Sequence, residues 1–153
     1  MDQGTIENAY APFVDALRQG GFETPADGWP AEFVAAHVLR NNDLISEVAE
    51  RVVARGRPAY DNSAAVEEAE LRALAEGAGG LFGLAAAVET SSRRLASAFG
   101  ALDEENGAYL VPTIIIDSGQ VVRDKPVAVR SLIEGNASFH LDMHFEQLKA
   151  LHR

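Results

Sequence analysis

Two histidines four residues apart, His140 and His144, lie in the middle of an apolar stripe near the end of the chain. Residues at this spacing on a helix lie on one face, one turn apart. The other members of that face are apolar, namely Ile133, Ala137, Leu148 and Leu151. Asp142 points the opposite way, as expected for a helix with one buried face. The pattern therefore predicts a helix whose two imidazoles face a core made by other parts of the chain.

Two earlier segments also predict helices with one buried face. The first runs from Thr5, as N-cap, to about Leu17, and Pro12 predicts a kink or a later start. The second runs from Pro30, as first helical residue, to about Ala54. Its buried face combines His37, and Asn41 one turn on, with apolar residues: Phe33, Val34, Leu44, Val48 and Val52.

A third helical pattern begins after the capping side chains of residues 60–63 and continues to Leu102. Unbroken, this helix would be about 60 Å long at roughly 1.5 Å per residue. We therefore expect a break or bend at its glycines, Gly77, Gly79, Gly80 and Gly83. Because no strand precedes them, we interpret these glycines as close helix packing and not as a phosphate-binding loop.

After residue 107 the pattern changes to that of a β-hairpin. Residues 109–116 are rich in β-formers, residues 117–119 form a turn, and residues 120–123 predict the return strand. One hairpin is too little for a sheet of its own, so it must pack against the helices. Pro126 then opens a last helix that ends near Leu151 and contains Gly135, which weakens it locally.

These elements predict an all-α fold in one domain over residues 1–153: a four-helix bundle with a small β-hairpin before the last helix. In such a bundle His37 can face His140 and His144, whereas His152 lies outside the pattern at the C-terminus. A single buried histidine is usually a packing residue. Three without partners would cost about 1–3 kcal/mol each, a cost that a shared metal ion removes.

The composition narrows the possible partners. The net charge of -10 argues against nucleic acid and anionic membranes, which select basic surfaces. The chain has no cysteine, which excludes disulfides, thiolate metal sites and cysteine nucleophiles. No secretory signal and no run of roughly 18 apolar residues is visible, so we expect a cytoplasmic protein.

Three motifs together resemble a known group of proteins. They are Gly28-Trp29-Pro30 leading to the helical His37, the terminal His-x-x-x-His pair, and the hairpin sequence of residues 111–117. In this order they resemble the DinB/YfiT-like metalloenzyme superfamily and, more narrowly, the N-terminal domain of mycothiol-dependent maleylpyruvate isomerases. The resemblance implies an up-down-down-up four-helix bundle, a divalent metal such as zinc or nickel, frequent homodimers, and low-molecular-weight thiols as cosubstrates.

Carried over residue by residue, the resemblance implies His37, His140 and His144 as metal ligands. The isomerases look to have a glutamate at the position of His140, and they carry a second, C-terminal domain that these 153 residues do not include. The resemblance therefore implies the metal site more directly than it implies maleylpyruvate isomerisation.

Three imidazoles hold a divalent ion at about 2.0–2.1 Å and leave one coordination position of zinc open, as in catalytic sites. A thiol can bind there as thiolate, and a water can bind there with its pKa lowered to about 7. We therefore expect a transferase or isomerase that uses mycothiol or a related thiol to attack an electrophilic substrate. The alternatives are a metal-hydroxide hydrolase and a non-catalytic module that binds a small ligand or dimerises.

Other residues near these motifs have two explanations each. Asn41 can bind a ligand beside the metal or can be a buried asparagine bonded to a neighbouring helix. The guanidinium groups of Arg40, Arg93 and Arg94 can meet carboxylates of an acidic thiol, although solvated helix faces explain them as well. Trp29 fits a lid over one end of the bundle better than a stacking platform. No general base is predicted, since the candidate carboxylates have turn or hairpin explanations: Asp61, Asp117 and Asp124.

Overall fold

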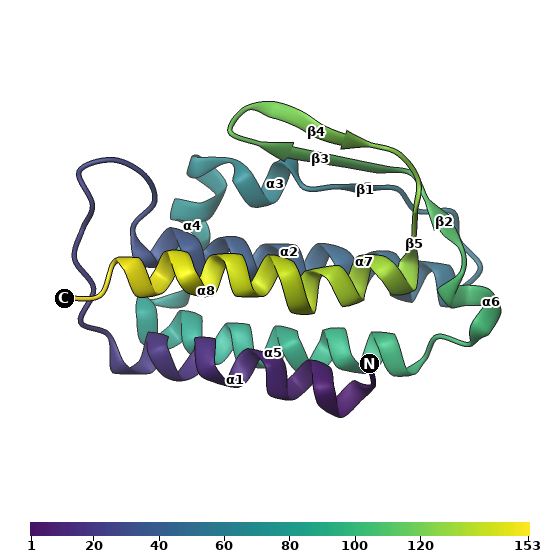
Figure 1. Ribbon diagram of the computed structural model, residues 1–153, viewed down its shortest axis with the longest axis horizontal. Coiled ribbons are helices and arrows are strands. Elements are labelled where there is room, and N and C mark those ends of the chain that lie inside the picture. The colour runs from purple at the N-terminus through teal and green to yellow at the C-terminus, as the bar shows by residue number, and fades with distance from the viewer.

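The computed structural model describes residues 1–153 as a mostly helical protein with a small amount of β-structure. Four long helical segments lie along its longest axis (Figure 1). They are α1 (Gln3–Gln19), α2 (Ala31–Val53), α5 (Leu81–Gly100) and a final run made of α7 (Val129–Gly135), η1 (Asn136–His140) and α8 (Leu141–Ala150). In Figure 1, α2 and α5 run toward one end of the molecule, whereas α1 and the final run point toward the other.

The first helix begins earlier than its sequence suggests. Asp2, and not Thr5, is the N-cap, because the Asp2 carboxylate accepts the backbone N–H of Thr5 at 2.8 Å. Pro12 lies inside α1 without ending it. Both Pro12 and Asn8, whose carbonyl loses its helical partner, are exposed, so water can replace the missing hydrogen bond.

The expected break in the long helical pattern is present at the glycines. It separates α4 (Glu68–Ala78) from α5 at Gly79 and Gly80, whose φ angles of 81° and 96° suit glycine. The two helices are bent by 101°. No single helix is both long and apolar enough to cross a membrane; α4 and α5 pass that test only together, as this bent pair.

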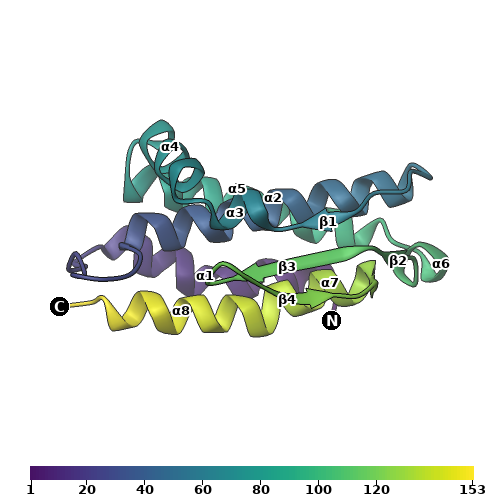
Figure 2. The ribbon, with the colours of Figure 1, turned by 90° about the horizontal axis from the view of Figure 1, so that it is seen from above.

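The β-structure is more extensive than one hairpin. The predicted hairpin is β3 (Thr113–Asp117) with β4 (Gln120–Asp124), and β1 (Tyr60–Asp61) adds a parallel strand beside β3. The stretch predicted as one strand from residue 109 is divided at Pro112, and the preceding β2 (Leu110–Val111) pairs with β5 (Val127–Ala128). Figure 2 shows the hairpin beside the helices and close to the short α3 (Ser63–Val66).

The last helical run differs from the prediction in two ways. It begins at Val129, after β5, and not at Pro126. Its middle turn is a π-helix that follows directly after Gly135. Of the predicted buried face of this run, Ile133, Ala137 and Leu148 are buried, and Leu151 at its end is half-buried. Together with α1, α2 and α5, these residues form one hydrophobic core.

Candidate metal centre

Three histidines from two separate helical segments meet in the structure. His37 comes from α2, His140 from the last position of η1, and His144 from α8. The Nε2 atom of His140 lies 3.0 Å from Nε2 of His37 and 3.1 Å from Nε2 of His144. His37 and His144 are buried, at 3% and 7% exposure, while His140 stays partly exposed. We call these three residues the histidine cluster.

The other ring nitrogens of two of these residues are already bonded. Nδ1 of His37 lies 2.5 Å from the carbonyl oxygen of Ala65 in α3, and Nδ1 of His144 lies 2.8 Å from Oε1 of Gln147. Because both oxygens only accept, each Nδ1 carries the proton of its neutral ring. The two Nε2 atoms therefore present lone pairs toward His140. Such a second hydrogen bond, which fixes ring and tautomer, is usual for metal-binding histidines.

All three imidazoles are held in the neutral form. Burial, with a smaller contribution from the nearby His144, lowers the pKa of His37 to about 4. Burial also lowers the pKa of His140, with smaller contributions from His144 and His37. For His144, burial lowers the pKa, and the hydrogen bond to Gln147 partly opposes this. Neutral imidazole is the form that binds a metal ion, so near pH 7 the rings are ready to do so.

The arrangement fits a metal ion better than it fits hydrogen bonding among the rings. At most one proton, on Nε2 of His140, is available for three nitrogens that face one another. One ring nitrogen from each residue lies within 4.8 Å of the other two. Ligands about 2.0–2.1 Å from a tetrahedral ion would be separated by roughly 3.3 Å, close to the 3.0 and 3.1 Å observed. The three-histidine group can therefore hold a metal ion.

Two further side chains border the histidine cluster. The half-buried indole of Trp29 lies against His37, with ring centroids 5.2 Å apart. Asp117, at the exposed end of β3, is close enough for its charge to raise the pKa of both His37 and His144 slightly against the effect of burial. The end of β3 is held beside α3 because Asn62 exchanges two hydrogen bonds with the backbone of Ile116.

A second group of buried polar side chains lies next to the first. We call it the asparagine cluster, and it consists of Tyr10, Asn41, Asn42, Tyr60, Ser91 and Asn136. In it the side-chain amide nitrogen of Asn41 donates to Oδ1 of Asn136 at 2.7 Å, and Oδ1 of Asn41 accepts from the Tyr60 hydroxyl. Asn41, which was predicted to bind a ligand or to be a buried structural asparagine, thus forms hydrogen bonds with two other side chains.

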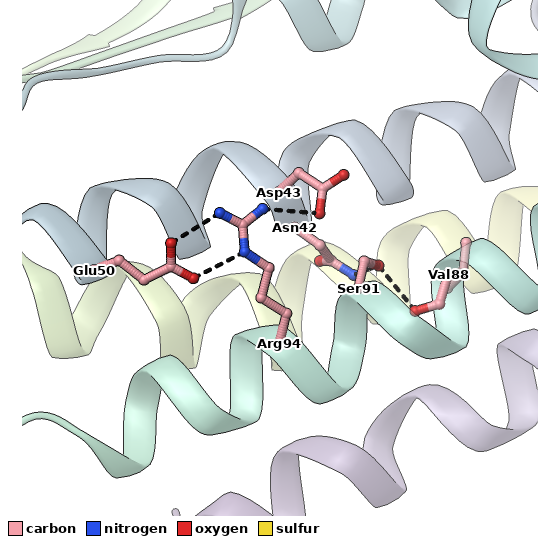
Figure 3. A network of polar contacts seen from close by, with 6 residues as sticks. All are labelled: Asn42, Asp43, Glu50, Val88, Ser91 and Arg94. Carbon is pink, nitrogen blue, oxygen red and sulfur yellow. Dashed lines mark hydrogen bonds and ion pairs between the residues drawn. The ribbon is translucent and has the colours of Figure 1, made fainter.

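The three arginines considered from the sequence form no hydrogen bond with either cluster. Arg94 of α5 reaches Glu50 and Asp43 of α2, as Figure 3 shows together with the bond from Ser91 to the carbonyl of Val88. Arg93 pairs with Glu89 one turn back on the same helix. Arg40 forms no ion pair.

Sequence reasoning missed the groups that orient the histidines. Gln147 stands three residues after His144, so the helical spacing that revealed the histidine pair could also have revealed this contact. The Ala65 carbonyl could not be found in this way, because a backbone oxygen leaves no mark in the residue pattern. Asn136 was not identified because its neighbours on the last helix are mostly apolar, and nothing in their spacing marks it as a hydrogen-bonding residue.

Comparison with known proteins gives one family match. The model of the mycothiol maleylpyruvate isomerase N-terminal domain family matches residues 5–124, which is most of the chain. The matched part contains His37 and ends before His140 and His144, so the role of these two rests on their geometry. Searches of curated proteins and of solved structures give no match.

Proposed function

The chain belongs to the family of mycothiol maleylpyruvate isomerase N-terminal domains, within the DinB/YfiT-like superfamily, and on this premise we propose a metal-dependent, thiol-using enzyme. His37, His140 and His144 hold a divalent ion, zinc or nickel. The reaction is a transfer or an isomerisation in which a low-molecular-weight thiol, mycothiol or a relative, attacks an electrophilic small molecule. The fold is proposed to be the up-down-down-up bundle of the superfamily, in a cytoplasmic homodimer.

The observation that carries the proposal is that the Nε2 atoms of His37, His140 and His144 converge. On His37 and His144 the hydrogen bond at Nδ1 leaves Nε2 with a lone pair that points toward His140. A packing role alone would not require two separate acceptors to turn these lone pairs toward a third imidazole. Leaving buried nitrogens without donors costs about 1–3 kcal/mol each, whereas coordination uses the same lone pairs productively.

Each neighbouring group has a role in this proposal. Ala65 and Gln147 hold the tautomers of His37 and His144, and burial keeps all three rings neutral near pH 7. Trp29 covers one side of His37, and the partial exposure of His140 leaves the cluster reachable from outside. A divalent ion held by His37, His140 and His144 would act as a Lewis acid that lowers the pKa of a cosubstrate thiol.

The thiol must come from a cosubstrate because the chain has no cysteine of its own. The family name points to mycothiol, and the proposal takes that class of compound from it. The exposed carboxylate of Asp117 is close enough for its negative charge to act on His37 and His144. We expect this charge to favour thiols that carry no carboxylate close to the sulfur.

The test uses cobalt(II) in place of the native ion, because a thiolate bound to cobalt gives a strong near-ultraviolet charge-transfer band. The proposal predicts that mycothiol or a simple thiol produces this band in the cobalt-loaded protein and not in His144→Ala. A thiol-dependent loss of an electrophile should follow in the loaded wild type. A cobalt-loaded protein without a thiol band, but with esterase activity, would instead support a metal-hydroxide hydrolase. A protein that binds no cobalt would be a ligand-binding or dimerisation module.

A further inference from the structure

The π-helical turn η1 connects the two polar clusters. It spans Asn136–His140, so one end belongs to the asparagine cluster and the other to the histidine cluster. The N–H of Leu141 donates to the carbonyl of Asn136, five residues back, which is the π-helical pattern. Such turns are rare, appear mostly as single insertions in α-helices, and are frequent at functional sites. A turn of this kind needs specific interactions to hold it.

Asn136 supplies the strongest of these interactions. Its side chain is buried, at 5% exposure. Its amide nitrogen donates to Oδ1 of Asn42 at 2.8 Å and to the hydroxyl of Tyr10 at 3.1 Å. Its Oδ1 accepts from Asn41 at 2.7 Å. The start of the π-turn is therefore tied to α1 and α2 by three hydrogen bonds in the core.

Two local features support the same turn. Gly135, immediately before it, reduces the preference of this segment for regular α-helix. The hydroxyl of Ser138 donates a hydrogen bond to the carbonyl of Glu134 at 2.6 Å. This bond gives a partner to a carbonyl just before the turn, where the regular α-helical hydrogen bonds are interrupted.

His140, at the other end of the turn, is the histidine that most needs such support. His37 and His144 are each oriented by a hydrogen bond at Nδ1, whereas the hydrogen bonds of His140 involve only its Nε2, toward the other two rings. No side chain or carbonyl outside the cluster fixes the His140 ring. Its direction therefore depends on the backbone that carries it.

We propose that Asn136 is a positioning residue for the metal centre: through the π-turn it directs the His140 imidazole toward His37 and His144. The inference rests on the proposed function, since it assumes that the three histidines bind a metal ion. Loss of the Asn136 bonds frees the turn to adopt the more stable α-helical pattern. Relaxation of the turn moves the backbone that carries His140 relative to α2 and takes its imidazole out of reach of the other two rings.

The test compares zinc affinity and the visible spectrum of bound cobalt(II) in wild type and Asn136→Leu, which removes the amide and keeps a similar volume. Loss of an outer-shell partner typically weakens metal affinity about 10–100-fold, and we expect a loss in this range with weaker cobalt absorption. Ser91→Ala is the matched control. It breaks the asparagine cluster at its far end, at the bond from Asn42, and should keep affinity within about threefold.

A double-mutant cycle with His140→Ala separates positioning from general destabilisation. If Asn136 acts through His140, Asn136→Leu has no further effect on metal affinity once His140 is alanine. If Asn136→Leu does not fold, Ser138→Ala tests the same turn from outside the core and should weaken zinc binding about three- to tenfold.

Three outcomes overturn or separate the claims. Wild-type affinity and spectrum in folded Asn136→Leu would overturn the inference while leaving the metal centre intact. Where only Ser138→Ala folds, unchanged affinity in that variant would overturn it too. A wild-type protein that binds neither zinc nor cobalt would contradict the proposed function itself.

Discussion

The asparagine cluster and the histidine cluster are both buried groups of polar side chains, but only one of them is complete without a ligand. In the asparagine cluster each donor meets an acceptor. Asn136 donates two hydrogen bonds and accepts one. Asn42 donates to the hydroxyl of Ser91, which in turn donates to the carbonyl of Val88. In the histidine cluster three ring nitrogens face one another with at most one proton among them. The first therefore stabilises the fold, and the second is suited to bind an ion.

The largest expected effect is on the histidine cluster. His37→Ala and His144→Ala should each lose stoichiometric metal, because a lost ligand costs more than the roughly 10–100-fold cost of a lost outer-shell partner. The measurement is zinc affinity by titration calorimetry, with circular dichroism to verify folding. His152→Ala is the matched control, since His152 is exposed, packs against Phe22 and is not a member of the histidine cluster. Full metal retention by both cluster variants would refute the assignment.

The second prediction uses pH to separate the clusters. The folded pKa of His37, about 4, lies below the ordinary 6.5, so the unfolded chain takes up the proton first as pH falls. Stability is thus full above about pH 6.5 and is lost as pH falls toward 4, by about 2 kcal/mol between pH 8 and pH 5 for this residue alone. Burial raises the pKa of Tyr10 and Tyr60, so the asparagine cluster does not titrate in this range.

Urea unfolding of the metal-free protein at pH 8 and pH 5 measures this loss. His37→Ala serves as reference, because the carboxylates that also titrate near pH 5 remain in both proteins. The same pH dependence in wild type and His37→Ala would show that His37 is not buried in its neutral form.

The third prediction breaks the asparagine cluster instead. Ser91→Ala leaves the amide of buried Asn42 without an acceptor and should lower the free energy of unfolding by about 1–2 kcal/mol. Its zinc affinity should stay near that of wild type, since the hydrogen bonds of Ser91 go to Asn42 and Val88 and not to a histidine. Denaturant unfolding and metal titration of the same sample test both statements. A variant that loses its metal and keeps its stability would reverse the roles given to the two clusters.

The smallest effect belongs to the exposed contacts between α2 and α5. Arg94 pairs with both oxygens of Glu50, at 2.8 and 2.9 Å, and approaches Asp43 at 3.4 Å (Figure 3). Exposed ion pairs contribute about 0–1 kcal/mol, so Arg94→Ala should shift the urea midpoint little and leave metal binding unchanged. A loss larger than that of Ser91→Ala would mean that this surface contact, and not the buried cluster, holds the two helices together.

The sequence predicted the long helices and the histidine cluster because both depend on periodicity. Apolar spacing located α1, α2 and the last helical run, and the glycines marked the bend between α4 and α5. The same spacing placed His37, His140 and His144 on buried helix faces, and the structure brings them close together.

Features that depend on distant contacts were not predicted. The two-residue strands β1 and β5 are too short for a period, and β1 pairs with a strand more than fifty residues away. The π-turn is held by side chains from other helices, so the residues within it predict only an ordinary helix weakened by Gly135. The cap of α1 was misplaced because Asp2 and Thr5 are both good capping residues, and the contact between them decides which one caps.

The central claim is that the histidine cluster holds a metal ion, and elemental analysis tests it most directly. The protein is purified without an affinity tag, beside a variant with alanine at positions 37, 140 and 144. We predict about one zinc or nickel ion per wild-type chain and none in the triple variant. Wild-type protein without metal, even after incubation with zinc, would contradict the claim and make the three histidines packing residues of a helical core.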